Sequence, residues 1–255
     1  MMLARYFKKS VTCFMAALVL AGGLSASVQA ETYVGTSVGA SFGGSLGNTT
    51  YTGLPPNGGN TLTIPELDLD ASTAWGVRVG HYFSFLPWLG VEFQWYRRQP
   101  DADTSAVTLT GTLPTPAGPF NFTGAANASA IVDNMDTFGF MFNVRAPQDM
   151  VQNWGGIEPY VGVGLAVNSI DIEEFRLTNT AGTVTTRSAE GGDVDSGFLG
   201  QVGANYSINK RLKAFGEYKY THANFTSNQW DPSGQTETDF EDHTVVFGLK
   251  FTLFE

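Results

Sequence analysis

The stretch HTVVFGLKFTLFE, residues 243–255, ends the chain on an alternating pattern. Its apolar residues take every second position, and they are Val245, Phe247, Leu249, Phe251 and Leu253. Neighbouring side chains of a strand point to opposite faces, so a period of two indicates a strand, whereas a helix repeats about every 3.6 residues. The stretch therefore predicts a strand with one apolar face and one polar face, and the polar face carries Lys250.

Seven further segments repeat this pattern, so the sequence predicts eight strands in all. They are TYVGTSVGASFG (32–43), TAWGVRVGHYF (73–83), WLGVEFQWY (88–96), DTFGFMFNVR (136–145), PYVGVGLAVN (159–168), GFLGQVGANYSI (197–208) and RLKAFGEYKYTH (211–222). Each has an apolar face, and the opposite faces, taken together, carry glycines and charges of both signs.

The connections between these segments alternate strictly between short and long. The short ones are residues 84–87, 146–156 and 209–211, and the long ones are 47–70, 100–133, 172–195 and 227–241. Bacterial outer-membrane barrels have this rhythm of short periplasmic turns and long external loops. We therefore expect an all-β, eight-stranded antiparallel transmembrane barrel whose apolar face meets lipid. A soluble β-sandwich, which would bury the apolar face, is the alternative.

The first residues have the pattern of a secretory signal peptide. Arg5, Lys8 and Lys9 precede the apolar run VTCFMAALVLAGGL, and small residues lead to Ala30. We expect residues 1–30 to be the signal and residues 31–255 to be the barrel domain, with a helical membrane anchor as the alternative. The chain of 255 residues has a net charge of −10, which argues against a nucleic-acid partner.

The strand sequences resemble a known family. The segments EPYVGVGLAV (158–167), LKAFGEYKYTH (212–222) and GLKFTL (248–253) look like those of the small outer-membrane β-barrels, which include the barrel of outer-membrane protein A, the OmpX and Ail type and the opacity-type adhesins. The resemblance implies a monomer in the outer membrane, inserted by the barrel-assembly machinery. It also implies a terminal assembly signal at Gly248, Phe251, Leu253 and Phe254, although this chain ends on Glu255 where the family ends on an aromatic residue.

The second long loop leaves the strand count open. TSAVTLTGTL (104–113) alternates, and FNFTG (120–124) follows a proline-rich turn, so both could be additional spanning strands of a ten-stranded barrel. We expect instead that they extend an external hairpin, because threonine, glycine and alanine dominate and no aromatic girdle accompanies them.

Charged residues on the polar faces predict a charge network in the lumen. They are Arg78, Glu92, Arg145, Lys213, Glu217, Lys219 and Lys250. A barrel of eight strands is just wide enough for its own side chains, and buried charges must be paired. We therefore expect a salt-bridge plug, with a conducting pore as the alternative.

Other residues are expected at the interface with outer-leaflet lipid and lipopolysaccharide: Trp75, Trp95, Arg97, Arg98, Tyr220, His222 and His243. The two histidines would lie opposite each other if the last turn centres on DPSG (231–234). The pair loosely resembles the His-x-Ser motif of lipid A deacylases, but here Asn224 stands at the serine position. Because acyl transfer needs an activated nucleophile, a lipid A-modifying hydrolase is only our third hypothesis.

Carboxylates gather in the long loops: Glu66, Asp68, Asp70, Glu173, Glu174, Asp193, Asp195, Glu237, Asp239, Glu241 and Asp242. We expect a solvated acidic surface that loosely binds divalent cations. No zinc, phosphate-loop or nucleotide motif is present, so no cofactor and no resident metal are expected. The leading hypothesis is a non-enzymatic surface protein, structural or adhesive, whose loops contact a host or another cell surface. A narrow channel or carrier for small or apolar solutes is second.

Overall fold

The computed structural model describes residues 30–47, 49–54, 60–100, 102–115, 118–179, 182–187, 193–227 and 235–254. The predicted signal peptide lies outside these residues except for Ala30, so its assignment stays a prediction. Among the described residues, no helix is long and apolar enough to cross a membrane.

Eight strands form the barrel. In order around the wall they are β1 (Glu31–Leu46), β5 (Ser72–Tyr82), β6 (Leu89–Arg98), β8 (Gly118–Arg145), β9 (Ile157–Asn179), β11 (Asp193–Ser207), β12 (Leu212–Ser227) and β13 (Gln235–Phe254). Each strand pairs antiparallel with the next, and β13 returns to β1, where Lys250 lies opposite Gly35. This closure satisfies the backbone groups that lipid cannot, and it confirms the eight-stranded antiparallel barrel.

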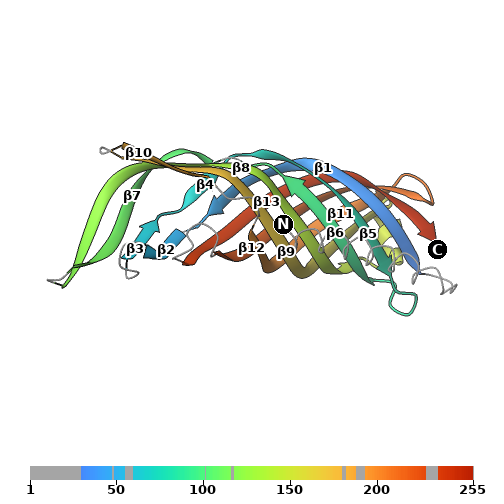
Figure 1. The fold of residues 1–255 in the computed structure, drawn as a ribbon. Helices are drawn as coiled ribbons and strands as arrows, with labels where there is room; N and C mark the ends of the chain where they lie inside the picture. The colour runs from blue at the N-terminus through green and yellow to red at the C-terminus, as the bar shows by residue number, and fades with distance from the viewer. Residues whose placement is uncertain are drawn as a thin grey trace.

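The connections separate the barrel into two ends. The short turns at 83–88 and 208–211, and the connection 146–156 with the helix α2 (Gln148–Asn153), lie at one end, which we name the turn end. The first residues of β1 and the last residues of β13 also lie at the turn end, because Thr32 pairs with Phe254. The long connections lie at the opposite end, which we name the loop end (Figure 1).

Five shorter or partly separate strands continue the wall at the loop end. They are β2 (Thr49–Leu54), β3 (Asn60–Ile64), β4 (Leu67–Leu69), β7 (Ala102–Thr115) and β10 (Gly182–Arg187). In this extension the order is β9–β8–β7–β3–β2–β13, so strands from all four long connections form one sheet (Figure 1). The segment 104–113 lies in β7 and continues the hairpin beyond the barrel, so the ten-strand alternative is wrong.

Near the turn end, apolar side chains point outward and polar ones point inward. On β8, Phe140 and Phe142 are 38% and 51% exposed, whereas Asn143 and Arg145 are buried. On the other strands, Val38 is 64%, Leu165 73% and Phe247 64% exposed. A water-soluble protein does not present a continuous apolar belt of this kind, so the β-sandwich alternative is wrong and the belt faces lipid.

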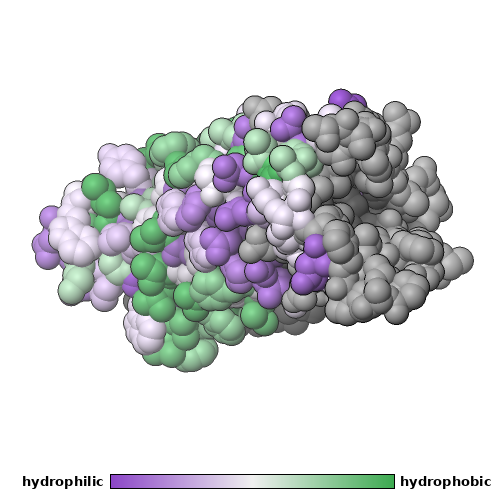
Figure 2. Space-filling model, turned by 90° about the vertical axis from the view of Figure 1, so that its left-hand side faces the viewer, coloured by the Kyte–Doolittle hydropathy of each residue, from purple (hydrophilic) through white to green (hydrophobic). Residues whose placement is uncertain are grey.

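Toward the loop end the two faces exchange polarity. On the same strand, Ala128 and Val132 are buried inside, whereas Asn127 and Asp133 are exposed outside. Figure 2, which views the molecule from the left-hand side of Figure 1, shows polar residues over the middle of the visible surface, next to apolar ones. Since lipid requires an apolar exterior and water allows a polar one, the exchange near Asp136 marks the height at which the wall leaves the membrane.

Glycines on the inner face make room for large aromatic rings. A Cβ atom built on Gly80 would stand 2.3 Å from Cζ of Tyr33, and one on Gly248 would stand 2.6 Å from Cζ of Phe215. Glycine therefore alternates with valine and leucine in these strands because a ring from a neighbouring strand lies directly over the glycine backbone.

Gly80→Ala is expected to destabilise the barrel by about 1–3 kcal/mol, because the added methyl group overpacks against Tyr33, which is hydrogen-bonded to Glu92. Urea unfolding of the protein refolded in bilayers measures the change. Gly124→Ala is the matched control, since a Cβ there meets no described atom within 4 Å. Equal unfolding midpoints for the two variants would contradict the prediction.

Candidate functional site

The described interior of the barrel holds three polar clusters, stacked from the turn end to the loop end, and a large apolar cluster lies beyond them at the loop end. The lower cluster is Glu31, Arg145, Glu158 and Lys213; the central cluster is Arg78, Glu92, Glu217, Lys219 and Lys250; the upper cluster is Arg98 and Asp242. The apolar cap is Leu46, Leu67, Leu69, Val107, Ala126, Ala128, Val132, Met135, Ile170, Ala223 and Phe240.

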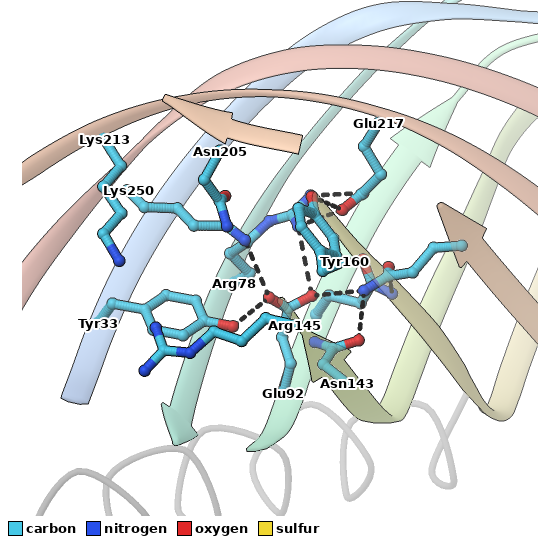
Figure 3. Close-up of polar contacts among 12 residues, drawn as sticks. Tyr33, Arg78, Glu92, Asn143, Arg145, Tyr160, Asn205, Lys213, Glu217 and Lys250 are labelled. Carbon is cyan, nitrogen blue, oxygen red and sulfur yellow. Dashed lines mark hydrogen bonds and ion pairs between the residues drawn. The ribbon is translucent and has the colours of Figure 1, made fainter. Parts of the chain in front are cut away.

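In the central cluster, Arg78 binds two carboxylates (Figure 3). Its guanidinium makes two parallel bonds to Glu217, Nη1 to Oε2 at 2.8 Å and Nη2 to Oε1 at 2.9 Å, and Nη1 lies 3.3 Å from Oε1 of Glu92. Nζ of Lys219 is 3.1 Å from Oε1 of Glu217. These side chains are buried, so the bidentate geometry offsets the cost of removing their charges from water.

Polar uncharged side chains complete the central cluster. The hydroxyl of Tyr33 donates to Oε2 of Glu92 at 2.6 Å, and that of Tyr160 donates to Oε2 of Glu217 at 2.5 Å. Lys219 also donates to Gln94, and Gln94 donates to Gln201, which in turn donates to Asn143. The two carboxylates therefore receive hydrogen bonds from four strands, and this ties distant parts of the wall together.

Lys250 occupies a different setting in the same cluster. Its ammonium lies 3.9 Å from Oε2 of Glu92 and has no hydrogen-bond partner among the described residues. Three rings surround it, with centroids 5.0 Å away for Tyr33, 4.4 Å for Tyr160 and 5.0 Å for Phe215. The π faces of these rings stabilise the third cation of a cluster that holds two carboxylates.

The lower cluster closes the turn end. Arg145 and Lys213 both bind Glu31, the latter at 2.8 Å, and both approach Glu158. The guanidinium carbon of Arg145 lies 3.8 Å from the ring centroid of Tyr82. The cluster has two cations and two carboxylates, so its charges balance.

The upper cluster corrects two expectations. Arg98 was expected at the lipid interface and Asp242 in a solvated loop, but both are buried, and Nη1 of Arg98 lies 2.5 Å from Oδ2 of Asp242. Asp242 also accepts bonds from Ser41 and Thr244. The sequence contains an indication of this position. Asp242 and Lys250 are an even number of positions apart, so in one strand they have the same parity, that is, their side chains point to the same face. The acidic run 237–242 instead suggested a loop.

The sequence-predicted lumen residues are therefore all inside, but they form two groups. Five of the seven meet in the central cluster, whereas Arg145 and Lys213 lie in the lower one. The partners that were not foreseen are Glu31, Glu158, Tyr33 and Tyr160. All four occupy inward-facing alternate positions of their strands, which could have identified them, but strand alternation alone does not say which inward residues share a height.

The rim at the polarity exchange holds predicted interface residues. Trp75 is 47% exposed, and its ring meets that of Trp95 edge-on at 4.8 Å. Arg97 makes a two-point contact with Asp136, at 2.8 and 2.6 Å, and the indole nitrogen of Trp95 donates to the same carboxylate. The tryptophans thus lie at the height expected of an interfacial aromatic girdle.

A second part of the rim carries the histidines. His243 pairs across the strands with Tyr220, and His222 pairs with Glu241, so the expectation that the histidines face each other is wrong. Nδ1 of His243 is hydrogen-bonded to the hydroxyl of Tyr218 at 2.6 Å, and Nδ1 of His222 lies 3.6 Å from Oε1 of Glu241. Both histidines nevertheless remain on the outer face.

The proposed assembly signal lies on the lower part of β13. Phe251 is 44% exposed on the lipid face, and Gly248 lies beneath Phe215 on the inner face. The side chain of Phe254 and all of Glu255 lie outside the described residues. Within the described ranges, no group of three or more His, Cys, Asp or Glu side chains could hold a metal ion.

Comparison with known proteins gave a match to one family model and similarity to solved structures. The family model described as "Outer membrane protein beta-barrel domain" matches residues 16–251. Neisserial surface protein A is 9% identical with a TM-score of 0.44, covering 87% of this chain and 97% of that one. OprG of Pseudomonas aeruginosa is 11% identical with a TM-score of 0.39, covering 89% and 98%. The protease OmpT of Escherichia coli is 9% identical with a TM-score of 0.36, covering 89% and 99%. Comparison with curated proteins gave no match.

Proposed function

The chain belongs to the outer membrane protein beta-barrel domain family and is an integral barrel of the outer membrane, and from this we propose that it is a non-enzymatic surface protein with an adhesive role. The proposal rests on one observation, which is that the molecule consists of a membrane-spanning barrel and an external sheet. A barrel with a filled lumen spans the lipid, and a sheet made of strands from the four long connections projects beyond it. The barrel anchors the sheet, and the sheet makes the contacts.

The filled lumen argues against the channel hypothesis. A solute would have to pass three clusters of paired charges and then the apolar cap, whose described members are each at most 7% exposed. Removing buried ion pairs from their partners costs several kcal/mol, so the clusters do not open at thermal energies. We expect no discrete conductance steps when the refolded protein is placed in planar bilayers.

The rim argues against a lipid A hydrolase. His222 is followed by Ala223, which is buried inside the wall, and the hydrogen-bond partner found for His243 is the phenol of Tyr218. A phenol hydrogen-bonded to a histidine accepts an acyl group less readily than a serine hydroxyl does. The exposed aromatic rings of the rim are instead typical of residues at a lipid boundary. In this proposal the rim residues contact lipid and lipopolysaccharide. The acidic loops loosely bind divalent cations, which bridge the loop carboxylates to the anionic lipopolysaccharide.

Shortening one hairpin tests the adhesive role. Residues 101–132 can be replaced by a Gly-Ser turn, because Gln99 already donates to the carbonyl of Asp133 at 2.8 Å and Arg98 pairs with Met135. We expect the shortened protein to insert and to keep its heat-modifiable gel mobility. Cells that carry it should lose most of their attachment to host-cell monolayers, matrix-coated wells and one another.

The control is an equal insertion of Gly-Ser residues into the periplasmic turn at 209–211, which leaves the external sheet intact. If the shortened variant attaches as well as the parent while this control also attaches, the external sheet is not adhesive and the proposal fails.

A further inference from the structure

The outer face of the extension carries a two-dimensional array of threonines. Strand register aligns Thr50 of β2, Thr63 of β3, Thr110 of β7 and Thr123 of β8 in one row across the sheet. Two residues along each strand, a second row aligns Thr52, Thr61, Thr112 and Asn121. We name these eight positions the threonine lattice.

The five lattice members whose side chains the structure describes lie on the outside of the sheet. Thr110, Asn121 and Thr123 are exposed, and Thr63 and Thr112 are half-buried. Val107, on the opposite face of β7, is buried in the apolar cap. Each lattice strand reads Thr-x-Thr or Asn-x-Thr in sequence, with Tyr51, Leu62, Gly111 and Phe122 as the residues between.

The spacing of the lattice is set by the sheet. Adjacent strands lie about 4.8 Å apart and alternate residues of one strand about 6.8 Å apart, so the eight positions repeat in both directions. A hydroxyl group both donates and accepts hydrogen bonds. A repeating surface of such groups matches a partner that itself presents hydroxyls at regular intervals.

The charge of the lattice selects among such partners. None of its eight residues is ionised, although the chain carries a net charge of −10, and Glu237 of β13 pairs with Thr50 at its border. An acidic polymer would meet repulsion from the acidic chain, and a basic one would be drawn to the carboxylates that border the lattice, such as Glu237, and not to its hydroxyls. The matching partner is therefore neutral.

We propose that the threonine lattice is the adhesive surface and that its partner is a neutral polysaccharide presented as an ordered solid. This inference rests on the proposed adhesive function and names the contact and its chemistry. The strands that carry the lattice lie in the extension at the loop end (Figure 1), so the lattice is available to a solid outside the cell.

The test uses vesicles that carry the full refolded protein, mixed with cellulose and chitin as ordered neutral solids, with cross-linked dextran as a disordered neutral gel, and with pectate gel as an anionic solid. We expect retention on cellulose or chitin, little on dextran and none on pectate. Thr110→Val with Thr123→Val keeps shape and strand preference but removes two hydroxyls, and should lower retention roughly tenfold. Thr110→Ser with Thr123→Ser keeps the hydroxyls and should retain binding. Heat-modifiable mobility verifies that all variants fold.

Three outcomes overturn the inference: no retention on cellulose or chitin, equal retention by the valine pair, or retention on ice crystals without retention on any polysaccharide. Any of these, combined with lost cell attachment by the shortened hairpin variant, leaves the adhesive function standing and removes only its assigned partner. Unchanged attachment by the shortened variant removes the adhesive function itself.

Discussion

Leu249→Arg is expected to prevent insertion or to unfold the barrel at markedly lower urea. Leu249 is the central one of the five alternating apolar residues of β13, and it is 46% exposed on the lipid face. An arginine there would meet hydrocarbon, at a cost of about 2–4 kcal/mol near the middle of the bilayer. Urea unfolding in bilayers measures the loss, and heat-modifiable gel mobility reports it more simply.

Two controls test whether the effect depends on the depth of the new charge in the bilayer and on the face of the strand that carries it. Ile208→Arg places the same charge at an exposed, outward position just beyond the turn end of β11, where the cost falls to about 0–1 kcal/mol. Lys250→Gln changes the neighbouring inward residue, and Glu92 keeps Arg78 and Tyr33 as partners, so its effect should be milder than that of Leu249→Arg. If Lys250→Gln were the more damaging substitution, the assignment of the two faces of β13 would be reversed.

Glu217→Gln is expected to destabilise the barrel by about 3–5 kcal/mol, since it removes one partner of a buried ion pair. The change leaves Arg78 with Glu92 alone, at 3.3 Å, and leaves Lys219 without its carboxylate. The central cluster would then hold three cations and one carboxylate in a site shielded from water. Equilibrium unfolding with and without salt measures the effect, which should resist salt because the pair is buried.

A double variant distinguishes loss of charge balance from loss of shape. Arg78→Met with Glu217→Gln restores the surplus of one cation found in the parent, so it should cost less than the sum of the two single variants. Asp136→Asn is the surface control, because its partner Arg97 is 32% exposed and such pairs contribute about 1 kcal/mol or less. A Glu217→Gln effect as small as that of Asp136→Asn would mean that the central cluster does not hold the wall together.

Alternation along the chain was sufficient to predict the barrel, its eight strands and the direction of most side chains. The reason is local: a strand has a period of two, and only a closed wall with lipid outside allows the face with Leu249 to be exposed while that with Lys250 is enclosed. The seven charges expected in the lumen were identified by this parity alone. The correct choice of eight strands over ten used the same kind of evidence, since the residues of 104–113 lack the aromatics of a membrane strand.

The partners of those charges were decided by the tertiary structure. Arg78 and Glu217 are 139 residues apart in the chain, and they meet because the register of several strands brings them to the same height across the lumen. Parity gives a side chain's face but not its height, so Arg98 and Asp242 were misplaced until strand pairing was known. The polarity exchange near Asp136 and the alignment of Thr63 with Thr110 likewise depend on hydrogen bonding between distant hairpins, which no single segment encodes.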